Sequence, residues 1–129
     1  MNLYATDPFG DLGRLQAEIF RAVRLVVDTG MHAKKWSREQ AIDYMVAKTG
    51  QTEAEVTREI ERYVVWPGQA TAYKTGQLAI VRMRAKAEAD LGDKFDLRKF
   101  HELILGNGAM PLGILERTVD EWIATEKAA

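Results

Sequence analysis

Two short stretches near the middle of the sequence mark the starts of helices. Ser37 is followed three residues later by Gln40, and Thr52 is followed at the same spacing by Glu55. This is the capping-box pattern, in which the side chains and backbone amides of the two residues bond reciprocally at the first turn. Gly50 lies between the two pairs, where a glycine typically ends a helix. These signals predict two consecutive, separately delimited helices.

The other expected helices follow from apolar residues at spacings of three and four. Asp11 is the expected N-cap of the first helix, and Gly30 has the position of its C-terminal glycine. Pro67 ends the helix that Thr52 starts, and Pro111 suits the first turn of the last helix. The expected helices cover residues 11–29, 37–50, 52–66, 68–91, 96–106 and 111–123.

The pattern predicts an all-α fold, because no alternating apolar run is bounded by hairpin turns. We expect residues 1–129 to form a single domain, a multi-helix bundle of about six helices with helix 68–91 as its long, central helix. The side chains expected to face the core from the first and the longest helix are Leu12, Leu15, Ile19, Val23, Val26, Val27, Leu78, Val81 and Ala85.

Composition excludes several classes of protein. The net charge of −1 gives no general attraction to nucleic acid or to anionic lipid. The chain has no cysteine, and its first residues lack the basic and apolar regions of a signal peptide. No apolar run approaches the length that spans a bilayer. We therefore expect a cytoplasmic protein without a nucleic-acid or membrane partner.

A first group of candidate site residues lies on one face of the first helix. Arg21, Arg24 and Asp28 recur at spacings of three and four, and His32 joins them if the helix continues for one more turn. A carboxylate four residues from an arginine can orient the guanidinium, which leaves its outer donors for a carboxylate or phosphate ligand. An imidazole there can donate to an oxyanion or carry a proton. The alternative is a solvated ion pair beside a solvated histidine.

A second group follows the Pro67-Gly68 pair. Gln69, Tyr73 and Gly76 fall on one face of the helix that begins there, and Lys74 is next to Tyr73. A glycine inside a helix suggests that a backbone or a ligand approaches closely, and a tyrosine hydroxyl can stabilise an oxyanion. The alternative is a packed tyrosine whose hydroxyl bonds a backbone group. We expect both groups to line one open cleft, with the Tyr73 hydroxyl within about 10 Å of the His32 ring.

Several catalytic motifs are absent from these 129 residues. The sequence contains no HExxH, no GxxxxGK[ST] and no GxSxG. Two histidines in the whole chain cannot build a three-histidine zinc site. We therefore expect no metal, no cofactor and no complete catalytic set in this chain.

Three blocks of sequence resemble a known family. The blocks "RAVRLVVDTGMHAKKWSREQAIDYM", "RYVVWPGQATAYKTGQL" and "LGDKFDLRKFHELILGNGAMPLGILERTVDEWI" are similar, in this order, to the C-terminal part of the bacterial domain-of-unknown-function family 885 (DUF885). The resemblance extends from about Leu12 to Ile123.

The resemblance implies a function that this chain cannot perform alone. Full-length members are several times longer, mainly helical, and resemble zinc metallopeptidases with an upstream HExxPGHH-type motif. None of those zinc-binding residues is present here. What matches is the downstream part, whose histidine and tyrosine face zinc and substrate in related helical enzymes. The resemblance thus implies that the two polar groups line a substrate pocket; the residues concerned are Arg24, Asp28, His32, Gln69, Tyr73 and Lys74.

Two functions from different classes remain open at this stage. The chain is the substrate-side portion of a metallopeptidase-like protein, with a complementary N-terminal half and a peptide-like or anionic ligand as partners. Alternatively, it is a stand-alone helical module that self-associates through the face that the missing half would cover. An adjacent reading frame that encodes HExxPGHH would favour the first.

Overall fold

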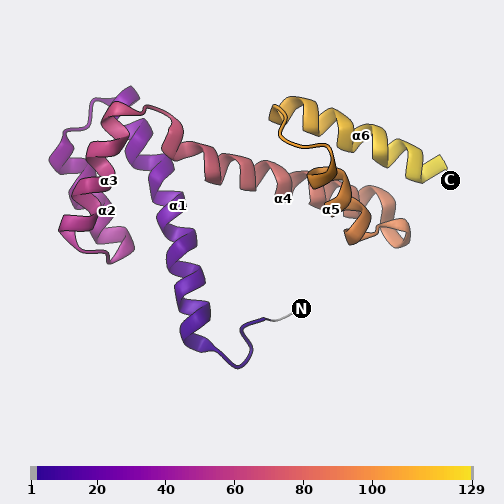
Figure 1. Ribbon diagram of the computed structural model, residues 1–129, viewed down its shortest axis with the longest axis horizontal. Coiled ribbons are helices and arrows are strands. Elements are labelled where there is room, and N and C mark those ends of the chain that lie inside the picture. Colours follow the sequence, from indigo (N-terminus) through magenta and orange to yellow (C-terminus); the bar gives the residue numbers. More distant parts are fainter. Residues whose placement is uncertain (1–2, 129) are drawn as a thin grey trace. The chain divides into compact units, whose positions relative to one another are not determined.

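A computed structural model describes residues 3–128, and in this range the chain forms six α-helices and no strand (Figure 1). The prediction of an all-α fold with about six helices is confirmed. The helices are α1 (Pro8–Lys34), α2 (Arg38–Thr49), α3 (Glu53–Val65), α4 (Ala72–Leu91), α5 (Leu97–Gly106) and α6 (Leu112–Ala128), with short 3-10 turns η1 (Gln69–Thr71) and η2 (Gly92–Lys94) on either side of α4. The chain divides into two compact units, one up to Lys74 and one from Thr75 onward.

Both predicted capping boxes are present. The Ser37 hydroxyl accepts from the Gln40 amide at 3.1 Å, and the Gln40 side chain accepts from the Ser37 amide at 2.9 Å. Thr52 and Glu55 make the same reciprocal pair at the start of α3. The ends at Gly50 and before Pro67 are also where the sequence predicted them. These two starts and ends are defined by local chemistry.

The predicted limits of α1 are wrong at both ends. The N-cap is Asp7 and not Asp11; its carboxylate accepts from the Gly10 amide at 2.8 Å, and Pro8 occupies the first turn. Gly30 does not end the helix, which continues to Lys34 and ends at Lys35 with a left-handed φ of 58°. Gly30 is instead a packing site, because a Cβ there would lie 2.6 Å from a ring carbon of Trp36.

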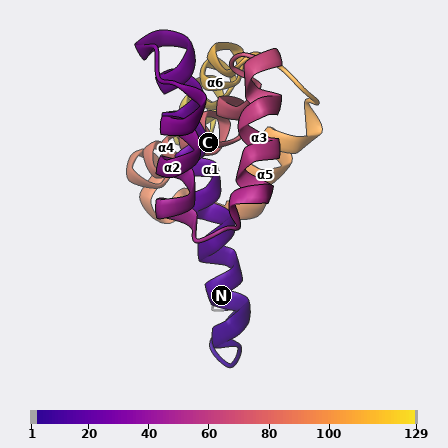
Figure 2. The same cartoon turned by 90° about the vertical axis from the view of Figure 1, so that its left-hand side faces the viewer.

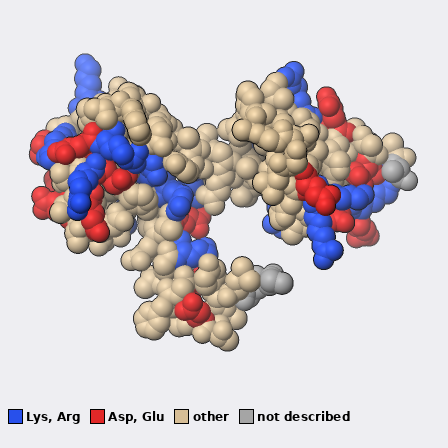
Figure 3. Space-filling view, in the orientation of Figure 1, with Lys and Arg blue, Asp and Glu red and all other residues tan. Residues whose placement is uncertain are grey.

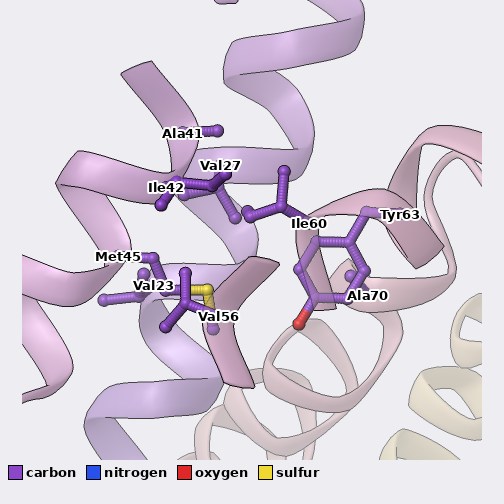
Figure 4. Close-up of a cluster of buried hydrophobic side chains, with 9 residues drawn as sticks. All are labelled: Val23, Val27, Ala41, Ile42, Met45, Val56, Ile60, Tyr63 and Ala70. Carbon is purple, nitrogen blue, oxygen red and sulfur yellow. The ribbon is translucent and has the colours of Figure 1, made fainter. Parts of the chain in front are cut away.

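The first unit is a three-helix arrangement in which α1 packs against α2 and α3 (Figures 1 and 2). Its core is drawn in Figure 4, where side chains from the three helices and η1 meet. Val23 and Val27 are the α1 contribution to it, as expected. Leu12, Leu15, Ile19 and Val26 were expected there too, but all four are exposed. The core residues are Val23, Val27, Ala41, Ile42, Met45, Val56, Ile60, Tyr63 and Ala70.

The second unit has a separate core formed by most of α4 with α5 and α6. The α4 side chains in this core recur every four residues and are Ala79, Met83, Ala87 and Leu91. The expected inward residues Leu78, Val81 and Ala85 are instead exposed. Helix α4 has 20 residues and α1 has 27, so the expectation that α4 is the longest helix is also wrong. The partners of α4 in this core are Phe100, Leu115, Val119 and Ile123.

Candidate functional site

The link between the two predicted polar groups is a backbone contact of Asp28. Its two carboxylate oxygens each lie 3.1 Å from the Gly68 amide nitrogen, and the side chain is buried. Gly68 has a φ of +82°, which glycine adopts without strain. Asp28 therefore fixes the chain reversal after α3, and η1 and the first turn of α4 begin from that fixed point. The expected bond between Asp28 and Arg24 is not among the ion pairs of residues 3–128.

Arg24 is a buried cation that is surrounded by aromatic rings. Its side chain is only 8% exposed, and its guanidinium carbon lies 4.8 Å from the ring centre of Tyr73, 5.4 Å from that of Tyr63 and 5.7 Å from that of Phe20. Its Nη2 donates to Gln69 Oε1 over a long 3.4 Å, and its Nε has no partner in the described part of the chain. Cation–π contacts thus stabilise the charge, while at least one donor stays free.

A series of side-chain hydrogen bonds runs from α3 to Gln69 and so to Arg24. Glu59 accepts from the Tyr63 hydroxyl at 2.6 Å and from Arg62 Nη2 at 2.7 Å, and Arg62 Nη1 donates to Gln69 Oε1 at 2.9 Å. Burial opposes ionisation of Glu59, but the bonds from Arg62 and Tyr63 outweigh it and lower the pKa of its carboxyl. Burial, and then the bond to Glu59, raises the pKa of Tyr63, which stays a neutral donor. The sequence analysis did not predict these hydrogen bonds, although Glu59, Arg62 and Tyr63 have the spacing of helix neighbours.

His32 and Lys74 have other partners. The Nε2 of His32 lies 3.0 Å from the Tyr63 carbonyl oxygen and must donate to it, so this bond joins the last turn of α1 to α3. Lys74 Nζ lies 3.1 Å from Glu18 Oε1, which joins the first turn of α4 to α1. The pairing with Lys74 lowers the pKa of the Glu18 carboxyl. The structure therefore brings Arg24, Gln69 and Tyr73 together, and no described bond connects His32 or Lys74 to these three.

Tyr73 covers one face of the Arg24 guanidinium and is itself 53% exposed. It is not the packed core tyrosine of the alternative interpretation; that description fits Tyr63, which is fully buried. Gly76 was expected to allow a close approach. A Cβ at Gly76 would meet no described atom within 4 Å, so no neighbouring backbone explains this glycine.

The donors of this cluster are of the types that bind carboxylates and oxyanions in proteins. It combines one buried guanidinium, whose Nε is itself buried and without a hydrogen-bond partner among the described residues, with a neutral amide and a half-exposed phenol. No carboxylate of the described residues forms an ion pair with Arg24. An arginine in such a setting binds planar anions well. The described residues contain no group of three or more histidine, aspartate or glutamate side chains that could hold a metal ion. No described helix is long and apolar enough to cross a membrane.

Comparisons with known proteins identify a family and similar solved structures. A family model described as "Bacterial protein of unknown function (DUF885)" matches residues 1–119. A solved structure entitled "The crystal structure of the putative lipoprotein from Colwellia psychrerythraea" is 60% identical, with a TM-score of 0.93. The match covers 95% of this chain but only 21% of that one, so the chain spans about a fifth of its solved relative. No curated protein matches this chain.

Proposed function

The chain belongs to the DUF885 family, and from this premise we propose that it is the C-terminal, substrate-side portion of a longer metallopeptidase-like protein. In this role it binds an anionic group of a peptide-like substrate and is not catalytic alone. The length of the Colwellia psychrerythraea relative supports the proposal, because this segment is there one fifth of a larger chain. The resemblance of full-length members to zinc metallopeptidases supports the reaction class.

The main support for the proposal is that Arg24 is buried without a carboxylate partner among the described residues. Burying a charge is costly unless it is paired, and Arg24 is buried with aromatic rings and an amide as its only partners in the described structure. Its Nε is buried and has no hydrogen-bond partner among the described residues. A substrate carboxylate, or the oxyanion that forms on a peptide carbonyl, would supply the missing negative charge.

Tyr73 has the position of a directional donor beside this cation. It contacts the guanidinium through its ring and is half exposed. Gln69 is held by two arginines and keeps the first turn of this segment next to Arg24. In this proposal Arg24 binds the anionic group, Tyr73 donates to it, and Gln69 and Asp28 are positioning residues.

The test uses a longer family member that carries both this segment and the HExxPGHH motif. Replacing the tyrosine aligned with Tyr73 by phenylalanine should lower peptide turnover by roughly 10²–10³-fold, because one oxyanion donor is lost. The zinc content and the melting temperature should stay unchanged, because the phenylalanine ring retains its contact with the arginine. The measurements are steady-state kinetics, metal analysis and calorimetry on the same preparation.

The matched control is the position aligned with Tyr44, a partly buried tyrosine that packs against Trp36 in the same unit. Phenylalanine there should leave turnover unchanged. Equal turnover in the Tyr73 variant and the unmodified protein would contradict the substrate-side role of this cluster. The alternative of a stand-alone interaction module would then be favoured, since α1 also carries an exposed apolar face.

A further inference from the structure

Helix α1 has a second apolar face that the first unit leaves partly exposed. Leu12, Leu15, Ile19, Ala22 and Val26, which we name the α1 seam, recur at alternating spacings of three and four residues. The four large side chains of the seam are 54%, 47%, 41% and 37% exposed in chain order. Val23 and Val27, which are buried against α2 and α3, lie on the neighbouring face. The seam is therefore distinct from the core contact of α1.

The spacing of the seam fits one kind of partner. Alternation of three and four is the a/d pattern of a helix that packs along another helix, with knobs entering holes of the partner. The N-terminal half of α1 extends beyond α2 and α3, and its surface in Figure 3 is mostly uncharged on the side shown (Figures 1 to 3). The charged side chains of this half are paired on another face, where Arg14 bonds Asp11 and Glu18.

We propose that the α1 seam is the docking surface for a helix from the remaining four fifths of the longer family protein. The solved relative supplies the argument, since about a fifth of its chain aligns with this segment and the rest is available to cover the seam. This inference rests on the part of the proposed function that places the chain in a longer protein. The α1 seam is then the surface that contacts the rest of that protein.

The size of the seam disfavours a second copy as its occupant. From Leu12 to Val26 the seam is about 21 Å long, since a helix rises about 1.5 Å per residue. A stable interface between separate proteins buries about 800 Å² on each side, which one short helix pair does not supply. A helix of the same polypeptide needs far less area, because the connection gives it a high effective concentration.

Charge disfavours a lipid surface. From Asp7 to Val26, the stretch that contains the whole seam, the chain carries three carboxylates and three arginines. One of these arginines, Arg24, is buried, so the exposed side chains of this stretch have no net positive charge. Helices that lie on membranes usually carry lysine and arginine on the polar face, which attract anionic lipid. A helical protein partner with apolar side chains fits this seam better.

The experiment compares this chain alone with a chimera. In the chimera, the aligned segment of the Colwellia psychrerythraea protein is replaced by this chain. Ile19→Glu introduces a carboxylate into the seam, and Ala17→Glu introduces one at an exposed position two residues earlier, nearly opposite on the helix. In this chain alone, neither variant should shift the melting temperature by much, since both side chains lie in solvent. In the chimera, Ile19→Glu should lower it by several degrees and Ala17→Glu should not.

A second measurement decides the matter if the chimera does not fold. Hydrogen exchange of backbone amides in residues 12–22 is compared between this chain and the unmodified Colwellia psychrerythraea protein. A covered seam should slow exchange in the longer protein by at least about tenfold. Equal exchange in both proteins, or equal effects of Ile19→Glu in both contexts, would overturn the proposal.

Two results would assign the seam to another occupant, either a second copy of the chain or a lipid surface, and each would overturn the proposal. A dimer of this chain in sedimentation equilibrium that Ile19→Glu abolishes would assign the seam to a second copy. Binding to phosphatidylglycerol vesicles that Ile19→Glu abolishes would assign it to a lipid surface. The proposed function is tested by a different measurement. If it is wrong, the Tyr73 variant keeps its turnover, whereas the docking proposal is tested by melting temperature and hydrogen exchange.

Discussion

Asp28 illustrates how an ionisable residue in a candidate site can act on the backbone. Its spacing from Arg24 suggested an ion pair, but both carboxylate oxygens accept from the Gly68 amide. The bond joins residues 40 positions apart in the chain. No local pattern reveals such a partner, so the sequence predicted that Asp28 belongs to the site and not what it does there.

Removing this acceptor should destabilise the first unit. Asp28→Ala leaves the Gly68 amide without its bond and should lower the free energy of unfolding by about 1–3 kcal/mol. Asp28→Asn retains one acceptor oxygen and should cost less. Urea unfolding at neutral pH measures both. The control is Asp43→Ala on the exposed face of α2, and an Asp28→Ala variant as stable as this control would contradict the assigned role.

Glu59 should make the free energy of unfolding depend on pH in the acidic range. Folding lowers the pKa of its carboxyl from its ordinary value of 4.5, because its bonds from Arg62 and Tyr63 outweigh burial. The stabilisation is therefore fully present above about pH 4.5 and is lost as the pH falls through the lowered pKa. Glu59→Gln should cost about 1 kcal/mol at pH 7, the difference between charged and neutral hydrogen bonds.

The measurement for Glu59 is urea unfolding of both proteins between pH 7 and pH 3. The difference in unfolding free energy between the unmodified chain and Glu59→Gln should shrink as the pH falls. Glu53→Gln, at an exposed position in the first turn of α3, serves as the control. A constant difference across the range would show that the charge of Glu59 does not contribute.

At the scale of helices, the capping boxes predicted the starts of α2 and α3, because the bonds that define them are local. The end of α1 could not be predicted in the same way. Gly30 has the residue type of a helix end, but here it makes room for the Trp36 ring. Only the packed structure distinguishes a glycine that is needed for a left-handed φ at a helix end from a glycine that is needed because a Cβ would clash with a neighbour.

Two glycines of α1 should respond to alanine in opposite directions. Gly30→Ala places a Cβ 2.6 Å from a Trp36 ring carbon, and the repacking should cost about 1–3 kcal/mol. Gly13→Ala meets no described atom within 4 Å and should stabilise the helix by up to about 1 kcal/mol. Thermal unfolding of the two variants measures the difference. A stabilising Gly30→Ala would mean that Trp36 does not occupy this position.

The same limit applies to the faces of the helices. Periodicity predicted that α1 has apolar residues at helical spacing, but it did not separate the face that α2 and α3 cover from the exposed seam. In α4 it selected Leu78, Val81 and Ala85, whereas Met83 and Ala87 are buried. A helix with apolar residues on two faces has no unique inward side until its partners are known.

At the scale of the whole molecule, the helical content leads to a simple spectroscopic test. Far-ultraviolet circular dichroism of the purified chain should give the double minimum of a mainly helical protein, with a cooperative loss on heating, because each unit has its own core. A β-rich or unfolded spectrum would contradict the fold.

Metal content gives a second test of the whole chain. The purified chain should bind no stoichiometric zinc and cleave no peptide, because its described residues form no group of three metal-ligating side chains. Metal analysis and a peptide-cleavage assay provide the measurements, with a longer family member as the positive control. About one tightly bound zinc per chain would contradict this expectation.

The bond between Asp28 and Gly68 also bears on when the cluster of Arg24, Gln69 and Tyr73 can form during synthesis. At about 5–20 residues per second, a ribosome needs roughly 2–8 s to advance from Asp28 to Gly68. During that interval the last residues of α1 and all of α2 and α3 are made, while Gln69 and Tyr73, which contact Arg24 in the folded protein, do not yet exist. A ribosome that pauses before Gly68 therefore holds a nascent chain in which Arg24 does not yet have its contacts with Gln69 and Tyr73.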